Sequence, residues 1–431
     1  MRGISIESAK PPNRPRKLIR RLILISLLIL LGFLVIDRIR RPKIDQNDLK
    51  ALSRIPIRKT FYIKANKPVK ELKLFIDDTK AVSIKLDKPD STIKFELKPS
   101  ALGIKEGEKN LTLKVRSGFF WRTYRLKTYI DLTPPALSAA RVSSGLLVGS
   151  SGAVKVRSEE DATLSLDCPG RKIQLTKISK DEFFGLFPVG LDSPLHFYCT
   201  ILAKDPAGNI SKLEIWMRPR SMRFRQENIE LNETTIRRVG VSLIEGANTM
   251  SPEEVFIQVN ERLRRESFSE LEELSSKSLP KKLWQGAFLM PERAQVVSSY
   301  GDLRYYILNG KKISESRHMG IDFASFANAP VRAGNSGVVV FARFLGIYGN
   351  TVVIDHGLGL MSIYSHLSEI VVKEGQNVAK GQFIGKTGTT GLAFGDHLHF
   401  GILVHGYEVN PSFWLSERWV QENIEKVFSG Q

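Results

Sequence analysis

The chain has 431 residues, enough for about three domains of ordinary size. Hydrophobic residues make up 42% and charged residues 25%, a balance typical of globular proteins that excludes a chain disordered throughout. The net charge of +19 indicates an anionic partner, which could be nucleic acid, an anionic membrane surface or a cell-wall polymer. The sequence contains no zinc finger, arginine-rich helix or aromatic RNA-binding signature, so we expect no nucleic-acid partner.

A basic tail at residues 1–21 precedes an uncharged apolar run, LILISLLILLGFLVI, at residues 22–36. The run is short for a spanning helix and could be the apolar core of a signal peptide. No small-x-small cleavage site follows it, which favours a retained transmembrane signal anchor over a cleaved signal. More basic residues precede the run than follow it, so the positive-inside rule places the N-terminus in the cytoplasm. The following Arg38, Arg40 and Arg41 act against that orientation. With this orientation, the rest of the chain lies in the periplasm, or otherwise outside the cytoplasmic (inner) membrane.

Residues 45–133 alternate apolar and polar side chains on a period of two, as in LKLFID and LTLKVR, which predicts a small β-sandwich module. After the proline-rich joint DLTPPALS, residues 134–220 form a second set of short strands. Its DPAGN hairpin resembles the last turn of bacterial immunoglobulin-like domains. Cys168 and Cys199 lie 31 positions apart in this module. They suit a disulfide between two sheets in an oxidising compartment, and the alternative is two buried thiols in neighbouring strands.

Residues 221–282 are predicted to form a helical linker. SPEEVFIQVNERL has a helix start at Ser251 and Pro252, acids in the first turn and apolar residues at helical spacing. The segment could pack against the rest of the chain or bind a partner. Residues 283–415 are again strand-like and glycine-rich, and residues 416–431 read as a helical tail. Six of the seven histidines lie in 283–415: His318, His356, His366, His397, His399 and His405.

Two short motifs in this part indicate a metal site. His318 and Asp322 lie four residues apart with Gly320 between them, so an imidazole and a carboxylate can converge. His397 and His399 are two apart in a strand and therefore point to the same face. Three such ligands with a fourth position open form a catalytic zinc site. Zinc lowers the pKa of its bound water to roughly 7 and polarises a carbonyl, which suits amide hydrolysis. Because no H-E-x-x-H helix is present, a histidine has to serve as the general base.

These residues resemble the LytM/lysostaphin-type zinc metallopeptidases, which cleave peptide bonds of bacterial peptidoglycan and include Gly-Gly endopeptidases. The match runs from Trp284 to Trp414 in the order of the family. It is carried by the motifs HMGIDFA, PVRAGNSGVVV, YGNTVVIDHG, YSHLS, GQNVAKGQFIGKTGTTG and GDHLHF.

The resemblance implies that His318, Asp322 and His399 hold one zinc ion. It also implies that His366 and His397 are the catalytic histidines, which act on the zinc-bound water and the developing oxyanion. His356 falls in the motif DHG and is expected to be structural, while His405 is expected to be solvated. Two positions depart from the family, Asp396 before the histidine pair and Tyr300 before Gly301, with Arg304 as the nearby basic residue. These departures concern fine specificity and not the metal site.

We therefore expect a mainly β, multidomain protein with one N-terminal transmembrane helix, two small β-modules, a helical linker and a C-terminal metallopeptidase domain. Its expected activity is zinc-dependent hydrolysis of peptide cross-links or stem peptides of peptidoglycan during cell-wall remodelling. The expected partners are peptidoglycan, the cytoplasmic membrane and a protein regulator. Two alternatives are a catalytically silent regulator that activates another wall hydrolase, and a structural link between membrane and wall. A regulator of the first kind would show substituted ligand positions, and none is substituted here.

Overall fold

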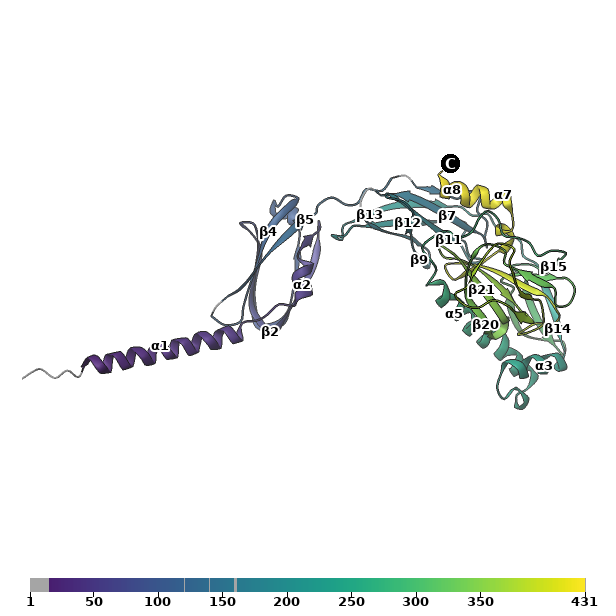
Figure 1. Ribbon diagram of the computed structural model, residues 1–431, viewed down its shortest axis with the longest axis horizontal. Coiled ribbons are helices and arrows are strands. Elements are labelled where there is room, and N and C mark those ends of the chain that lie inside the picture. The colour runs from purple at the N-terminus through teal and green to yellow at the C-terminus, as the bar shows by residue number, and fades with distance from the viewer. Residues whose placement is uncertain (1–14, 120, 139, 159–160, 431) are drawn as a thin grey trace, which may run out of the picture. The chain divides into compact units, whose positions relative to one another are not determined.

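The computed structural model describes residues 15–430, apart from residues 120, 139, 159 and 160. The chain divides into two compact units, Met1–Pro134 with Pro206–Asn209, and Pro135–Asp205 with Ile210–Gln431 (Figure 1). Strands dominate both units, and most helices lie at the N-terminus, between the β-rich parts and at the C-terminus. The predicted mainly β, multidomain architecture is confirmed. Most of the basic tail, residues 1–14, lies outside the described residues.

Helix α1 (Pro15–Arg40) contains the apolar run and extends beyond it at both ends. Its section Ile19–Ile39 has 21 residues and a mean hydropathy of 2.6, long and apolar enough to cross a membrane. At 1.5 Å per residue this section rises about 31 Å, close to the thickness of a bilayer core. The 15-residue run by itself was short for a spanning helix, and the flanking residues supply the missing length.

The first unit continues with helix α2 (Gln46–Ala51), one short 3₁₀ helix, η1 (Pro99–Leu102), and a five-stranded sheet in the order β1-β5-β4-β2-β3. The strands are β1 (Arg54–Ile55), β2 (Lys59–Ile76), β3 (Thr79–Leu97), β4 (Gly107–Arg116) and β5 (Arg122–Ile130). The register of β2 against β3 shifts between Lys64 and Val69. Side chains from both halves of β2, including Phe61 and Leu72, belong to one buried cluster, so the sheet bends over its own core. All five strands of the module predicted as a sandwich thus belong to one hydrogen-bonded sheet.

The second module begins the second unit and has two four-stranded sheets, β10-β11-β7-β6 and β13-β12-β8-β9. The first sheet contains β6 (Arg141–Val142), β7 (Ser151–Arg157), β10 (Thr176–Lys177) and β11 (Glu182–Pro188). The second contains β8 (Thr163–Cys168), β9 (Arg171–Gln174), β12 (Phe197–Lys204) and β13 (Ile210–Met217). Cys168 and Cys199 form a disulfide. Because β8 and β12 are paired neighbours, the disulfide lies within one sheet and does not join the two sheets as expected.

Residues 221–282 are not helical throughout. They begin with β14 (Gln226–Leu231), which pairs in parallel with β16 of the C-terminal part. The alternation in β14 includes few apolar residues, which is why the sequence pattern did not reveal it. The helices are α3 (Glu233–Leu243), η2 (Ala247–Thr249), α4 (Pro252–Ile257), the π-helical turn η3 (Gln258–Leu263) and α5 (Arg264–Ser275). Helix α4 starts as predicted, with Ser251 as N-cap in a capping box with Glu254.

The C-terminal part is built on a large sheet in the order β15-β18-β26-β22-β21-β20-β24, with β27 paired to β26. Its strands are β15 (Gln295–Ser298), β18 (Ile321–Ala324), β20 (Gly337–Leu345), β21 (Gly349–Gly357), β22 (Leu360–Ser365), β24 (Asn377–Val378), β26 (Leu398–Val404) and β27 (Tyr407–Val409). Two three-stranded sheets, β14-β16-β17 and β19-β25-β23, accompany it. They comprise β16 (Leu303–Leu308), β17 (Lys311–Arg317), β19 (Pro330–Arg332), β23 (Glu369–Ile370) and β25 (Phe383–Lys386). The short helices are η4 (Gly346–Tyr348), α6 (Pro411–Trp414), α7 (Glu417–Val420), η5 (Gln421–Glu425) and α8 (Lys426–Ser429).

Both faces of the large sheet are covered. On one face, Phe341, Val353 and Leu403 form a cluster with side chains of α3, α4 and α5. On the other face, Leu398 and Phe400 belong to a cluster that includes the C-terminal helices and residues of β7 and β11. The second module therefore shares a core with the C-terminal part.

Candidate metal centre

Strands β18 and β26 bring the two halves of the predicted metal site together. They pair antiparallel, and Asp322 is the direct cross-strand partner of His399. His318 lies in the turn that leads into β18. Gly320 in this turn approaches β26 closely, because a Cβ placed there would meet His399 Cε1 at 2.5 Å and the carbonyl oxygen of Phe400 at 2.6 Å. The glycine between His318 and Asp322 thus allows the turn to reach His399.

Three ligand atoms of these residues converge. His318 Nε2 lies 2.9 Å from Asp322 Oδ1 and 3.1 Å from His399 Nδ1. His399 Nδ1 lies 2.9 Å from the same Oδ1. All three side chains are buried. Ligands in a tetrahedral zinc site, each about 2.0–2.1 Å from the metal, lie about 3.3 Å apart, so this triangle has the dimensions of a zinc site.

The hydrogen-bond partners of His318 are those of a metal ligand. Its Nδ1 lies 3.0 Å from the carbonyl oxygen of Ser299, which can only accept, so Nδ1 carries the proton. Nε2 faces the carboxylate oxygen Oδ1 of Asp322 at 2.9 Å, so a cation, either a proton or a metal ion, has to lie between these two acceptors. A ring that donates its second nitrogen to a backbone carbonyl is also the usual arrangement of a metal-bound histidine.

The electrostatics of the other two residues suit a metal. Burial raises the pKa of Asp322, but its charge interactions and hydrogen bonds with His318 and His399 outweigh this and hold that pKa well below the ordinary value. Burial, partly opposed by Asp322, lowers the pKa of His399 to about 4. An ionised carboxylate and a neutral imidazole are the forms that bind metals.

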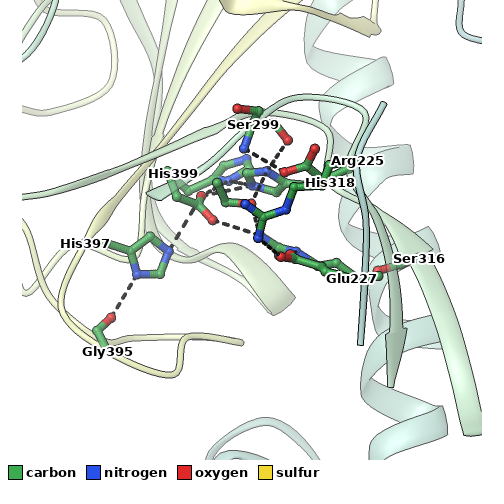
Figure 2. Close-up of polar contacts among 12 residues, drawn as sticks. Arg225, Glu227, Ser299, Ser316, His318, Gly395, His397 and His399 are labelled. Carbon is green, nitrogen blue, oxygen red and sulfur yellow. Dashed lines mark hydrogen bonds and ion pairs between the residues drawn. The ribbon is translucent and has the colours of Figure 1, made fainter. Parts of the chain in front are cut away.

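His366 and His397 lie beside the three convergent residues. Their rings are 4.8 Å apart between centroids, and His366 is 5.9 Å from the ring of His399. Figure 2 shows His397 to one side of His318 and His399, with Nδ1 2.8 Å from the carbonyl oxygen of Gly395. His397 Nε2 lies 3.7 Å from Asp322 Oδ1. The pair at 397 and 399 therefore lines one cavity, as expected for residues two apart in a strand.

His366 is held in an unusual backbone conformation, with φ of +63°. Its Nδ1 lies 2.8 Å from the carbonyl oxygen of Thr390 and therefore carries the proton. Burial, followed by the neighbouring His397 and His399, holds the pKa of His366 well below its ordinary value. The ring is a neutral imidazole with Nε2 able to accept a proton. Strained backbone of this kind is concentrated at functional sites.

The site opens into a cavity of about 390 Å³ that also contains residues not predicted from the sequence. Glu227 and Ile229 come from β14, and Arg264 comes from the start of α5. Tyr348 lies with its ring 5.7 Å from that of His399. Glu227, Ile229 and Arg264 belong to segments far from the histidine motifs, while Tyr348 begins the motif YGNTVVIDHG but has no predicted role in the site.

Arg304, the basic residue noted near Tyr300 and Gly301, contacts the candidate metal ligand Asp322. Its Nη2 donates to Asp322 Oδ2 over 3.1 Å, and its Nε donates to Glu227 Oε1 over 3.3 Å. It also donates to the hydroxyl of Ser298. The guanidinium thus holds the carboxylate so that Oδ1 faces the histidines.

Two further histidines lie away from the cavity. His356 Nδ1 is 2.7 Å from the carbonyl oxygen of Ser336, and its Nε2 is 2.7 Å from Ser362 Oγ, an arrangement suited to the structural role expected for it. Burial lowers the pKa of His356 to about 4. His405 was expected to be solvated, and this expectation is wrong, because its ring packs over Gly359. Burial lowers the pKa of His405 to about 4 as well.

Comparison with known proteins agrees with this geometry. Residues 316–411 match Peptidase family M23. Peptidoglycan DD-endopeptidase ShyA of Vibrio cholerae is 48% identical over 93 residues, which are 22% of this chain and 22% of that protein. DD-carboxypeptidase/endopeptidase Mpg of Neisseria meningitidis is 45% identical over 94 residues, again 22% of each protein. The chain spans about a fifth of the length of these curated relatives.

Among solved structures, the catalytic domain of lysostaphin from Staphylococcus simulans is 32% identical, with 28% of this chain and 92% of that chain covered and a TM-score of 0.24. The family match includes all five residues on which the metal and catalytic assignments rest: His318, Asp322, His366, His397 and His399. The C-terminal part of this chain is a domain of Peptidase family M23.

Proposed function

We propose that this protein is a zinc-dependent endopeptidase that hydrolyses peptide cross-links or stem peptides of bacterial peptidoglycan. The observation that carries the proposal is the convergence of His318 Nε2, Asp322 Oδ1 and His399 Nδ1 at the wall of an open cavity. The names of the similar proteins ShyA and Mpg support a DD-endopeptidase, which cuts between D-configured residues of the cross-link.

His318, Asp322 and His399 would hold the zinc ion, and the chemistry of these donors fits it. When bound there, zinc supplies a Lewis acid that activates water and polarises a peptide carbonyl. Arg304 keeps the Asp322 carboxylate oriented.

The chain's own proton-transfer groups are His366 and His397. Each donates Nδ1–H to a backbone carbonyl, which leaves Nε2 unprotonated in the neutral ring. We assign the general-base role to this pair: one ring accepts a proton from the attacking water, and the protonated ring then donates it to the leaving amine. The same imidazolium N–H stabilises the oxyanion that develops at the scissile carbonyl. Proton transfer therefore occurs without the glutamate base of helical zinc peptidases.

We also propose that α1 is a retained anchor in the cytoplasmic membrane, with the N-terminus in the cytoplasm and the peptidase domain in the periplasm. The length and hydropathy of Ile19–Ile39 support the anchor. The Cys168–Cys199 disulfide supports an oxidising compartment.

The test uses the purified full chain and isolated sacculi, with zinc and with a chelator, and identifies the released muropeptides by mass spectrometry. We expect zinc-dependent loss of cross-linked dimers. His399→Ala should abolish it, while the matched variant His196→Ala, which changes an exposed histidine of the second module, should retain it. A zinc-loaded, folded protein that releases no muropeptide would contradict the proposed activity.

A further inference from the structure

The loop between β4 and β5 exposes a large aromatic side chain beside the end of α1. The side chain of Phe119 is 76% exposed. Its ring lies 5.6 Å from the ring of Phe33 in α1, between centroids. Gly118 in the same loop lies against Asp37, since a Cβ there would be 3.4 Å from Asp37 Oδ1. The loop therefore packs against the last turns of the proposed anchor.

Phe119 lies beside the outer part of the candidate span. Phe33 precedes Ile39, the last residue of the candidate span, by six residues, or about 9 Å of helix. If Ile19–Ile39 spans the bilayer core, a side chain in contact with Phe33 lies about 9 Å inside the outer end of the span, among the acyl chains. The exposed ring of Phe119 is therefore placed to enter the acyl region.

Basic side chains surround the same loop. The ring of Trp121 lies between Lys73 Nζ, 4.8 Å from its centroid, and Arg116 Cζ, 5.0 Å from it. The two cations share one buried carboxylate, Glu71, so the group retains a net positive charge. Lys67 donates from Nζ to the carbonyl oxygen of Ile39 over 2.8 Å and adds a further cation at the helix end.

The charge of the whole chain is concentrated in this unit. Residues 1–134 contain 31 lysines and arginines and 13 acids, a net charge of +18. Residues 135–431 contain 33 and 32, a net charge of +1. Residues 1–21, which the proposed orientation places in the cytoplasm, contain 7 basic residues and 1 acid, or +6, so residues 22–134 carry +12. Basic residues next to a spanning helix attract anionic lipid headgroups.

We propose that residues 117–119 and Trp121 form a second membrane contact, in which Phe119 enters the outer acyl region, Trp121 the headgroup region, and Lys67, Lys73 and Arg116 bind anionic phospholipid. The inference rests on the proposed membrane anchor and not on the peptidase activity. Its consequence is that the first module is held on the bilayer surface and does not swing freely on α1.

The test reconstitutes the full chain into vesicles of phosphatidylcholine with phosphatidylglycerol, with plain or brominated acyl chains. Bromine quenches tryptophan emission on contact. Trp121 is one of five tryptophans, and the other four lie in the second unit. We expect lower tryptophan emission in the brominated vesicles. Trp121→Phe should abolish this difference, and the matched control Trp216→Phe should still show it. Phe119→Trp, a conservative change at an exposed position, should increase the loss.

A separate variant tests whether the contact requires anionic lipid. Lys73→Gln leaves Glu71 paired with Arg116 and should reduce the quenching in vesicles that contain phosphatidylglycerol. Equal quenching in pure phosphatidylcholine would overturn the anionic lipid assignment.

Flotation of the vesicles tests the membrane anchor independently of the loop contact. A chain that floats with the vesicles but shows equal emission in plain and brominated lipid overturns the loop contact and leaves the anchor intact. A chain that does not float overturns both. If the chain is not quenched but binds sacculi through Trp121, the aromatic and basic group recognises a wall polymer. That result also overturns the membrane contact. Cleavage of isolated muropeptides, measured in parallel, reports on the peptidase alone.

Discussion

Arg304 and Asp322 form an ion pair behind the candidate metal centre, with Nη2 of the guanidinium 3.1 Å from Oδ2 of the carboxylate. Both side chains are largely buried, and the second carboxylate oxygen, Oδ1, faces His318 and His399. Arg304 therefore fixes which oxygen is presented to a metal. Partners of this kind orient metal ligands and raise the affinity of the site.

Replacing Arg304 should weaken zinc binding without removing a ligand. We expect Arg304→Gln to raise the Kd for zinc about 10–100-fold, the usual cost of losing an outer partner of a ligand. The Kd is measured by competition with a chromophoric chelator. Arg343→Gln, which changes an exposed arginine paired with Glu270 and Glu374, is the control and should leave the Kd unchanged. An unaltered Kd in Arg304→Gln would show that the ion pair has no role in binding.

Zinc should stabilise the folded chain. A ligand that binds only the native state, present at about a thousand times its Kd, adds about 4 kcal/mol to the free energy of unfolding. We expect a chelator to lower the Tm of the wild-type chain by several degrees, and zinc to restore it. In His399→Ala the Tm should be the same with and without zinc. A zinc-dependent Tm in that variant would place the metal elsewhere.

Glu408 should make stability depend on pH. It is buried and accepts a hydrogen bond from the hydroxyl of Tyr348 over 2.6 Å. Burial raises its pKa from 4.5 to about 7, although Tyr348 and Arg264 act against this. Because the folded pKa is the higher one, the folded state binds the proton more tightly. The stability from this group is fully present below pH 4.5 and is lost as the pH rises through 7.

At pH 8 this loss amounts to about 3 kcal/mol relative to pH 4. Glu408→Gln keeps an acceptor for Tyr348 and removes the charge. We therefore expect the variant to gain stability over the wild type at pH 8 and to gain none near pH 4. Urea unfolding at both pH values measures the difference, and equal gains at both would refute the assignment to Glu408.

The second module should be required for the stability of the peptidase domain. Phe184 of β11 is fully buried and packs edge-on against Phe428 of α8, with centroids 5.0 Å apart. Trp414 also donates to Ser151 Oγ across the same contact, over 3.0 Å. We expect Phe184→Ala to lower the free energy of unfolding by about 3–5 kcal/mol, from lost apolar burial and the cavity left behind.

The matched control for Phe184 is Tyr198→Ala, which changes a half-exposed aromatic residue of the same module. It should cost far less in a chemical unfolding experiment. If both variants lose the same stability, the module does not share a core with the domain in solution.

Local sequence patterns identified the elements whose signals are local. The apolar run predicted α1, Ser251 and Pro252 predicted the start of α4, and the alternation of LTLKVR predicted β4. The ligand types were also readable, because His318, Asp322 and the His397–His399 pair occur in short motifs. A strand places residues two apart on one face, and that rule requires no knowledge of the fold.

Other features depend on segments that meet only in the folded chain. The sequence did not reveal that β14 joins β16, so Glu227 and Arg264 were not expected in the cavity. It also did not distinguish a disulfide between sheets from one between the paired strands β8 and β12.

The amino-acid sequence by itself thus determined the apolar N-terminal helix, the strand-rich composition and the residues able to hold a metal, because helix and strand periods and ligand chemistry are properties of short segments. Only the tertiary structure decided that Oδ1 of Asp322 meets Nε2 of His318 and Nδ1 of His399, with Arg304 behind them. Convergence to about 3 Å depends on strand register and on the close approach of Gly320, which are set by packing across the whole sheet.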